Sequence, residues 1–288
     1  MKSIHGRGLG WHSDLPDFRD HTPDSPTVAK VLGKSAPLKK ASAAAKLPTK
    51  VDLRQYCSPI EDQGQINSCT AHAGTAMYEY FEQRAFGKYV DASRLFLYKV
   101  TRQLLQFDGD SGAYLRDTMK AMVLFGLPPE KYWPYNVKQY DDDPNSFCFS
   151  FAQSYQAVDY YRLDPPGTSP KDLLAHIKTN LAAELPAMFG FSVYSSMPPL
   201  GEGTGNIPFP DKGDTLEGGH AVLAVGYDDN KKIGTNKGAL LIRNSWGTGW
   251  GEAGYGWLPY AYVERGLAQD FWSMVKGEFV DTDLFNKA

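Results

Sequence analysis

The chain of 288 residues has little of several things that would place it in a special class of protein. It has three cysteines, too few for a disulfide scaffold, so that at most one bridge can form. Its 30 Lys and Arg and 33 Asp and Glu give a formal net charge of -3, and it has no basic run long enough to indicate a nucleic-acid partner. The longest strongly apolar stretches, such as residues 221–226, are far too short to span a bilayer. We therefore expect neither nucleic acid nor a membrane as partner.

Targeting and metal-binding patterns are also missing. Lys2 and Arg7 lie near the start, but no apolar core of a secretory signal peptide follows them. The cellular address stays open between the cytoplasm and an export route that this sequence does not show. No Cys/His spacing is typical of a zinc site, and the acidic triplet 141–143 lacks the spacing of a calcium loop. We therefore expect no metal and no cofactor.

The first 46 residues differ in composition from the rest. Residues 6–26 are polar and rich in Gly, Pro, Asp and His, and residues 34–46 have the small, basic composition of a flexible linker. A weak Ala-rich helix is the alternative for this second stretch. The polar stretch carries four isolated apolar residues, Leu9, Trp11, Leu15 and Phe18. We place a boundary near Leu47 and treat residues 1–46 as an N-terminal extension.

Helical patterns come first along the chain and strand patterns come later. Apolar periodicity and capping residues predict helices at 71–86, from Ser93 past Leu104, at 114–125, and from Ser169 to Pro186. Apolar runs predict strands at 187–194, 220–227, 239–244 and 255–258. This order favours an α+β protein with two unlike lobes, a helical one over residues 47–157 and a β-rich one over residues 158–288.

Three short segments carry the chemistry. The segment 62–72 contains Gln63 and leads through a polar turn into Cys69, which we place at a helix N-terminus where the helix dipole favours a thiolate. The segment 218–227 puts His220 at the start of a buried strand, after two glycines. The segment 243–251 ends another apolar strand on Asn244.

These residues have the roles that a thiol nucleophile requires. His220 would pair with Cys69 and later protonate the leaving group, and Asn244 would orient His220 by one hydrogen bond. The side-chain amide of Gln63 would stabilise the developing oxyanion, with the backbone N–H of Cys69 as second donor.

Together the segments resemble the papain family of cysteine peptidases, and in particular a bacterial member of it. The segments around His220 and Asn244 match the family closely, residues 47–54 resemble its mature start, and residues 132–135 resemble its aromatic-Pro-Tyr loop. His220 follows Cys69 by 151 positions, close to the separation of about 130–150 found in the family. The resemblance implies a two-lobed fold with a cleft, and a monomeric endopeptidase that cleaves peptides or proteins. It also implies a zymogen whose own N-terminal segment lies in the cleft.

The chain departs from the family around the nucleophile. Where the family has Cys-Gly-Ser-Cys-Trp, residues 66–70 are Ile-Asn-Ser-Cys-Thr, so the family's usual disulfides cannot form. His72 stands where the family has Phe, and we interpret it as a hydrogen-bonded core histidine; a direct pair with Cys69 is the alternative. Cys57 and Cys148 are ordinary thiols or bridge each other.

The resemblance also assigns residues to the substrate cleft. The Gly-rich segment 109–114 would pair with an extended peptide through its backbone, and a neighbouring second pocket would take an apolar or aromatic side chain. Trp246 would shield the hydrogen bond between His220 and Asn244, and Trp250 would line the leaving-group side. The expected substrate-binding residues are Gly112, Ala113, Tyr114, Leu115, Gly190, Gly219, Trp246 and Trp250.

Other functions fit part of the pattern. Taken alone, Cys69 would be a buried structural thiol. A transferase could use the same Cys69 and His220 to pass an acyl group to an amine, and a non-catalytic module could bind peptides without cutting them. For the extension, inhibition of the cleft competes with simple packing on the surface.

Overall fold

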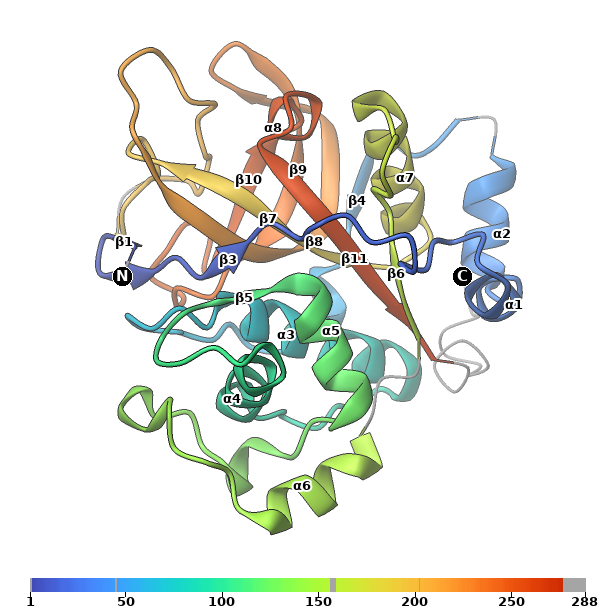
Figure 1. The fold of residues 1–288 in the computed structure, drawn as a ribbon. Helices are drawn as coiled ribbons and strands as arrows, with labels where there is room; N and C mark the ends of the chain where they lie inside the picture. The colour runs from blue at the N-terminus through green and yellow to red at the C-terminus, as the bar shows by residue number, and fades with distance from the viewer. Residues whose placement is uncertain (1, 45, 156–158, 202, 277–288) are drawn as a thin grey trace.

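A helical lobe and a β lobe pack against each other, and the start of the chain runs between them (Figure 1). The structure, a computed structural model, describes residues 2–44, 46–155, 159–201 and 203–276. Within these residues, no helix has the length and apolar character that crossing a bilayer would require.

The helical lobe is built around α3 (Cys69–Phe86), which is buried along most of its length. Ser93 caps α4 (Arg94–Leu105) by accepting the backbone N–H of Phe96, as its sequence pattern predicts. The helix α5 (Leu115–Leu124) buries Leu115, Met119 and Met122 against these two. The lobe also contains α6 (Ser146–Ala152) and the 3-10 turns Arg54–Tyr56, Glu130–Tyr132, Val137–Gln139 and Gln153–Tyr155.

The β lobe is a seven-stranded sheet in which every pairing is antiparallel. Its order is β10–β9–β8–β7–β11–β6, and β4 (Lys50–Asp52) pairs with β8, so residues shortly after the extension join this sheet. The helices α7 (Pro170–Ala182) and α8 (Ala261–Glu264) pack beside it. The remaining strands are β6 (Asp159–Arg162), β7 (Ala187–Tyr194), β8 (Leu216–Ile233), β9 (Asn236–Arg243), β10 (Tyr255–Pro259) and β11 (Ala268–Val275).

The extension has two ordered halves. Its first half contains the short strands β1 (Ser3–Ile4), β2 (Arg7–Gly8) and β3 (Trp11–His12), and β3 pairs with β5 (Ala113–Tyr114) of the helical lobe. Its second half forms α1 (Pro26–Leu32) and α2 (Ala36–Ala43), and α2 packs on α7. The prediction of a flexible linker over 34–46 is wrong for α2, where Ser35 caps the helix and Pro37 and Ala41 are buried. The Ala-rich helix is the alternative that the structure supports.

Candidate active site

Cys69 begins α3 and is fully buried at the junction of the two lobes. Its thiol lies against the backbone N–H of Ala221 on β8 and against that of Gly10 in the extension. Because Ala221 directly follows His220, this contact brings the thiol to the strand that carries the expected base. None of the three cysteines is bridged, so Cys57 and Cys148 are free thiols and the bridging alternative is wrong.

His220 and Asn244 form a hydrogen bond that fixes the imidazole tautomer. The Oδ1 atom of Asn244 accepts the backbone N–H of Ser245 at 2.8 Å, which identifies that atom as the acceptor. The Nε2 atom of His220 lies 2.8 Å from the same oxygen and must therefore donate to it. The neutral ring then keeps its lone pair on Nδ1, which is buried and has no hydrogen-bond partner among the described residues. A general base needs such a free nitrogen.

Two tryptophans enclose this histidine. The ring of Trp246 lies 4.8 Å from that of His220, centroid to centroid. Trp250 meets Trp246 edge-on at 5.8 Å, and its indole N–H donates to the Pro198 carbonyl. Both side chains are buried, so the imidazole of His220 packs against an aromatic wall.

The Gln63 side chain is held so that its amide N–H groups face the Cys69 loop and the extension. Its Oε1 atom accepts the hydroxyl of Ser245 at 2.6 Å, and its backbone carbonyl accepts the Tyr135 hydroxyl at 2.8 Å. Its Nε2 donates to the Ile66 carbonyl at 2.9 Å and to the Gly8 carbonyl at 3.1 Å. Sequence reasoning missed Ser245 and Tyr135 as the residues that orient Gln63, although both lie within segments that it singled out.

Residues 7–20, here called the covering segment, cross the site. Gly8 and Gly10 pass so close to the Cys69 loop that a Cβ on them would lie 2.4 Å and 1.9 Å from the carbonyl oxygens of Ile66 and Asn67. Only glycine allows this approach. The Gly10 carbonyl then accepts the backbone N–H of Ala113 at 2.8 Å. Of the isolated apolar residues noted in this stretch, Leu15 and Phe18 are 72% and 98% exposed, whereas Leu9 is buried.

The covering segment meets most of the expected substrate-binding residues. Gly112 lies under the Gly10 carbonyl, Tyr114 pairs with His12, and the Trp11 ring lies against Gly190 and Gly219. Leu115 is fully buried at the start of α5. The resemblance to the family predicted these residues as a group. In the structure, Gly112, Tyr114, Gly190 and Gly219 all meet the covering segment.

Burial shifts the pKa values of Cys69 and His220 in opposite directions. It raises the pKa of Cys69 to about 11 and lowers the pKa of His220 to about 4. Burial thus opposes the thiolate that the helix N-terminus was expected to favour. The backbone contacts of Ala221 and Gly10 act in the opposite direction on Cys69 and lower its pKa.

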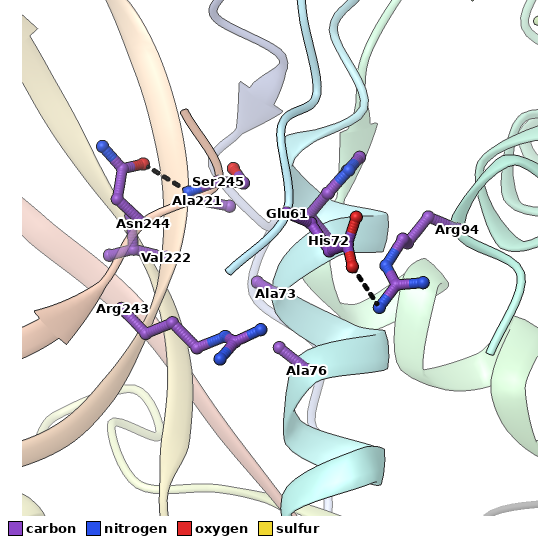
Figure 2. Close-up of a pocket in the computed structure, with 10 residues that line it drawn as sticks. All are labelled: Glu61, His72, Ala73, Ala76, Arg94, Ala221, Val222, Arg243, Asn244 and Ser245. Carbon is purple, nitrogen blue, oxygen red and sulfur yellow. Dashed lines mark hydrogen bonds and ion pairs between the residues drawn. The ribbon is translucent and has the colours of Figure 1, made fainter. Parts of the chain in front are cut away.

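His72 is a buried, hydrogen-bonded histidine of α3, in agreement with its interpretation as a core residue. Its Nδ1 lies 3.1 Å from the Ser68 carbonyl, and burial lowers its pKa to about 3. Figure 2 shows a small cavity between α3 and the sheet, about 10 Å³ in volume, with His72 and Asn244 on opposite sides. A cavity of this size has room for about one water. Nε2 of His72 is also buried without a partner among the described residues, so the direct pair with Cys69 stays an alternative.

The fold and this arrangement define the class of protein. The family described as papain family cysteine protease matches residues 47–273, which is most of the chain. The chain belongs to this family and is a papain-like cysteine peptidase.

Individual relatives agree with this assignment. The chain is 34% identical over 279 residues to an uncharacterized peptidase C1-like protein, L477, of Acanthamoeba polyphaga mimivirus, covering 94% of this chain and 87% of that one. It is 30% identical to a cysteine protease of Blomia tropicalis, with coverage of 76% and 62%. Among solved structures, xylellain, a cysteine protease from Xylella fastidiosa, is 35% identical, with a TM-score of 0.73 and coverage of 96% and 99%. A procathepsin L 3 of Tenebrio molitor shares the fold, with a TM-score of 0.65 and 20% identity over 94% of this chain and 77% of that one.

Proposed function

We propose that the chain is a cysteine endopeptidase in which Cys69 is the nucleophile, His220 the general base and acid, Asn244 its orienting partner and Gln63 an oxyanion donor. The observation that carries this proposal is the fixed tautomer of His220, with Nε2 donating to Asn244 and Nδ1 left without a partner. The buried thiol beside Ala221 lies at the strand of that histidine.

The reaction follows from these positions. The proton of the Cys69 thiol passes to Nδ1 of His220, and the thiolate attacks the carbonyl carbon of the scissile peptide bond. The Gln63 amide and the Cys69 backbone N–H stabilise the resulting oxyanion. His220 returns its proton to the leaving amine, and a thioester forms on Cys69. Water, deprotonated by His220, then hydrolyses the thioester and restores the thiol.

In this proposal the covering segment inhibits the peptidase by occupying its cleft, and it is not itself cleaved there. An attacked carbonyl must meet the Gln63 amide and the Cys69 thiol at the same time. In the covering segment, the carbonyl at Gln63 belongs to Gly8, whereas the group at the thiol is the N–H of Gly10. The two positions that a scissile carbonyl must meet together are thus occupied by groups of different residues, Gly8 and Gly10.

Trapping of the thiol tests the catalytic roles. A chain starting at Leu47 should react with a peptidyl electrophile at Cys69 far faster than at Cys57 or Cys148, as located by peptide mass spectrometry. It should also cleave small peptide substrates, and Cys69→Ala should abolish both. Equal labelling of the three thiols, with native unfolding behaviour, would contradict the proposal.

A further inference from the structure

The hydroxyl of Tyr98, on α4, binds two residues of the Gly-rich segment 109–114, here called the wall segment. It donates to Oδ1 of Asp110 at 2.5 Å and accepts the backbone N–H of Gly112 at 3.1 Å. The Tyr98 side chain is fully buried, so water does not compete for these bonds. The helix thus holds the segment that we expect to pair with substrate.

The same carboxylate reaches the loop that carries the nucleophile. Oδ1 of Asp110 also accepts the backbone N–H of Asn67 at 2.8 Å, and the Asp110 backbone carbonyl accepts the Asn67 side-chain amide at 2.8 Å. Asn67 stands two residues before Cys69. Tyr98, Asp110 and Asn67, here called the clamp, therefore join the wall segment to the Cys69 loop by hydrogen bonds.

The clamp decides which backbone groups of the wall segment face the cleft. The N–H of Gly112 is turned to the Tyr98 hydroxyl. The next N–H along the chain, that of Ala113, donates to the Gly10 carbonyl of the covering segment at 2.8 Å. A peptide that replaces the covering segment would meet the same Ala113 N–H, whose direction the held Gly112 amide fixes.

Arg102 braces the clamp from one helical turn further along α4. Its guanidinium lies over the Tyr98 ring, 4.3 Å from the centroid, and donates to the Gly109 carbonyl at the start of the wall segment. It also lies 3.0 Å from the carboxylate of Asp141. Arg102 is buried, so one ordered cation restrains both the Tyr98 ring and the wall segment.

We propose that Tyr98 and Asp110 are positioning residues, which hold the wall segment against the Cys69 loop so that a peptide paired with the wall presents its carbonyl to the thiol. This inference rests on the proposed peptidase function. A misplacement of about 1 Å can cost about 100-fold in rate, so such alignment matters for catalysis. The clamp acts on peptides that pair with the wall segment, and it leaves the reactivity of the thiol itself unchanged.

A double-mutant cycle in the full chain tests the clamp without any peptide hydrolysis. The covering segment pairs with the wall segment, so the rate at which iodoacetamide labels Cys69 reports how firmly the wall is held. Tyr98→Phe keeps the ring and removes the hydroxyl, and should speed labelling by about 10–100-fold. Trp11→Asp replaces an indole that donates to Asp270 by a second carboxylate, and releases the covering segment. In that background Tyr98→Phe should alter the labelling rate less than about threefold.

Two further variants control this cycle. Tyr140→Phe is the matched control, because the Tyr140 ring also lies near the Arg102 guanidinium, at 5.4 Å, while its hydroxyl is not part of the clamp. It should leave labelling unchanged. Asp110→Ala removes the acceptor shared by both donors and should reproduce the effect of Tyr98→Phe, with the two changes less than additive when combined. Chemical unfolding of each variant measures any loss of global stability.

A pair of substrates tests positioning in the full chain with Trp11→Asp. An extended peptide p-nitroanilide pairs with the wall segment, whereas p-nitrophenyl acetate has no peptide backbone with which to pair. Tyr98→Phe should lower kcat/KM for the peptide by about 10–100-fold and change the rate with p-nitrophenyl acetate less than about threefold. A purely structural role of Tyr98 would reduce both rates alike.

The outcomes separate this inference from the proposed function. Unchanged labelling with Tyr98→Phe, equal acceleration in both backgrounds, or equal losses with the two substrates would each overturn the role of the clamp, even in an active peptidase. Absence of turnover with both substrates would contradict the proposed function, and the labelling cycle would still decide whether the clamp holds the wall segment.

Discussion

The two halves of the N-terminal extension are held in contrasting ways. The covering segment contacts the cleft mainly through backbone groups, one indole and charged side chains, among them Asp14 and Asp20 with Arg116. The helices α1 and α2 instead bury apolar side chains, such as Val28 and Leu32, and line α7 and β6. In Figure 1 the first half crosses between the lobes, whereas the second lies at the side of the β lobe.

The contrast indicates that α1 and α2 anchor the extension, whereas the covering segment can be released. Apolar burial involves no titratable group, whereas buried ion pairs and hydrogen bonds depend on protonation and on every partner being present. The half that covers Cys69 is thus the half whose contacts solution conditions can change. The following predictions test this difference, beginning with the largest effect.

Removal of the extension should have the largest effect. A chain starting at Leu47 should turn over small peptides about 100-fold faster or more than the full chain, because a tethered blocker gains effective concentration from its linkage. The residue 1–36 peptide added in trans should inhibit only weakly. Initial rates at matched active-site concentration measure both, and equal rates at equal stability would contradict the inhibitory role.

Gln63→Ala should reduce kcat of the chain starting at Leu47 by on the order of 10–1000-fold, with little change in KM, since an oxyanion donor acts in the transition state. In the full chain the same change removes the donor to the Gly8 carbonyl and should loosen the covering segment. Steady-state kinetics with Cys69 labelling measure the two effects separately. Unchanged kcat would contradict the oxyanion role and would mean that Gln63 has only a structural role in its turn.

Acid should tighten the covering segment. Burial and the neighbouring Asp270 raise the pKa of Asp14 to about 7, from an ordinary value near 3.8. Arg116, Arg162 and the Trp272 N–H oppose this shift but do not cancel it. Docking therefore takes up a proton: its favourable contribution is complete below the pKa of the free segment and is lost as pH rises through about 7.

Labelling of Cys69 in the full chain, corrected with the chain starting at Leu47, should thus accelerate from pH 5 to about pH 7 by up to about tenfold per pH unit and then level off. The matched variant Asp14→Asn should flatten this dependence. A corrected rate that falls with rising pH would contradict the assignment.

A change in the anchoring half should have the smallest effect on the site. Leu32→Ala removes a buried side chain of α1, and should speed limited proteolysis within residues 21–46. It should leave the labelling rate of Cys69 within about threefold of the unaltered chain. A large rise in labelling would show that the two halves release together.

The sequence predicts the local parts of the molecule better than the contacts between distant ones. The cap at Ser93, the apolar face of α5 and the strand at 187–194 follow from neighbouring residues, and the structure agrees. The strand β11 was missed, because the left-handed Asp270 interrupts its alternation. The helix α2 was predicted as a linker, because its stability comes from packing on α7.

The same difference between local patterns and distant contacts holds for the site. The four expected catalytic residues stand in short motifs, whereas the residues that orient Gln63 act across separations that no local pattern encodes. Ser245 reaches Gln63 from 182 positions away, and Tyr135 from 72. The pKa values of Cys69 and His220 could not be predicted either, because they depend on how deeply the fold buries the two side chains.

The glycines of the covering segment make its return to the cleft unfavourable once it has been cut free. Gly8 and Gly10 fit the cleft because they have no Cβ, yet glycine loses more conformational freedom on ordering than any other residue. While the chain is intact, α1 keeps the segment close and limits that entropy loss. After a cut between the two halves, the segment would have to be ordered again from dilute solution. The first cleavage would therefore be effectively irreversible, because the cut segment would not return to the cleft.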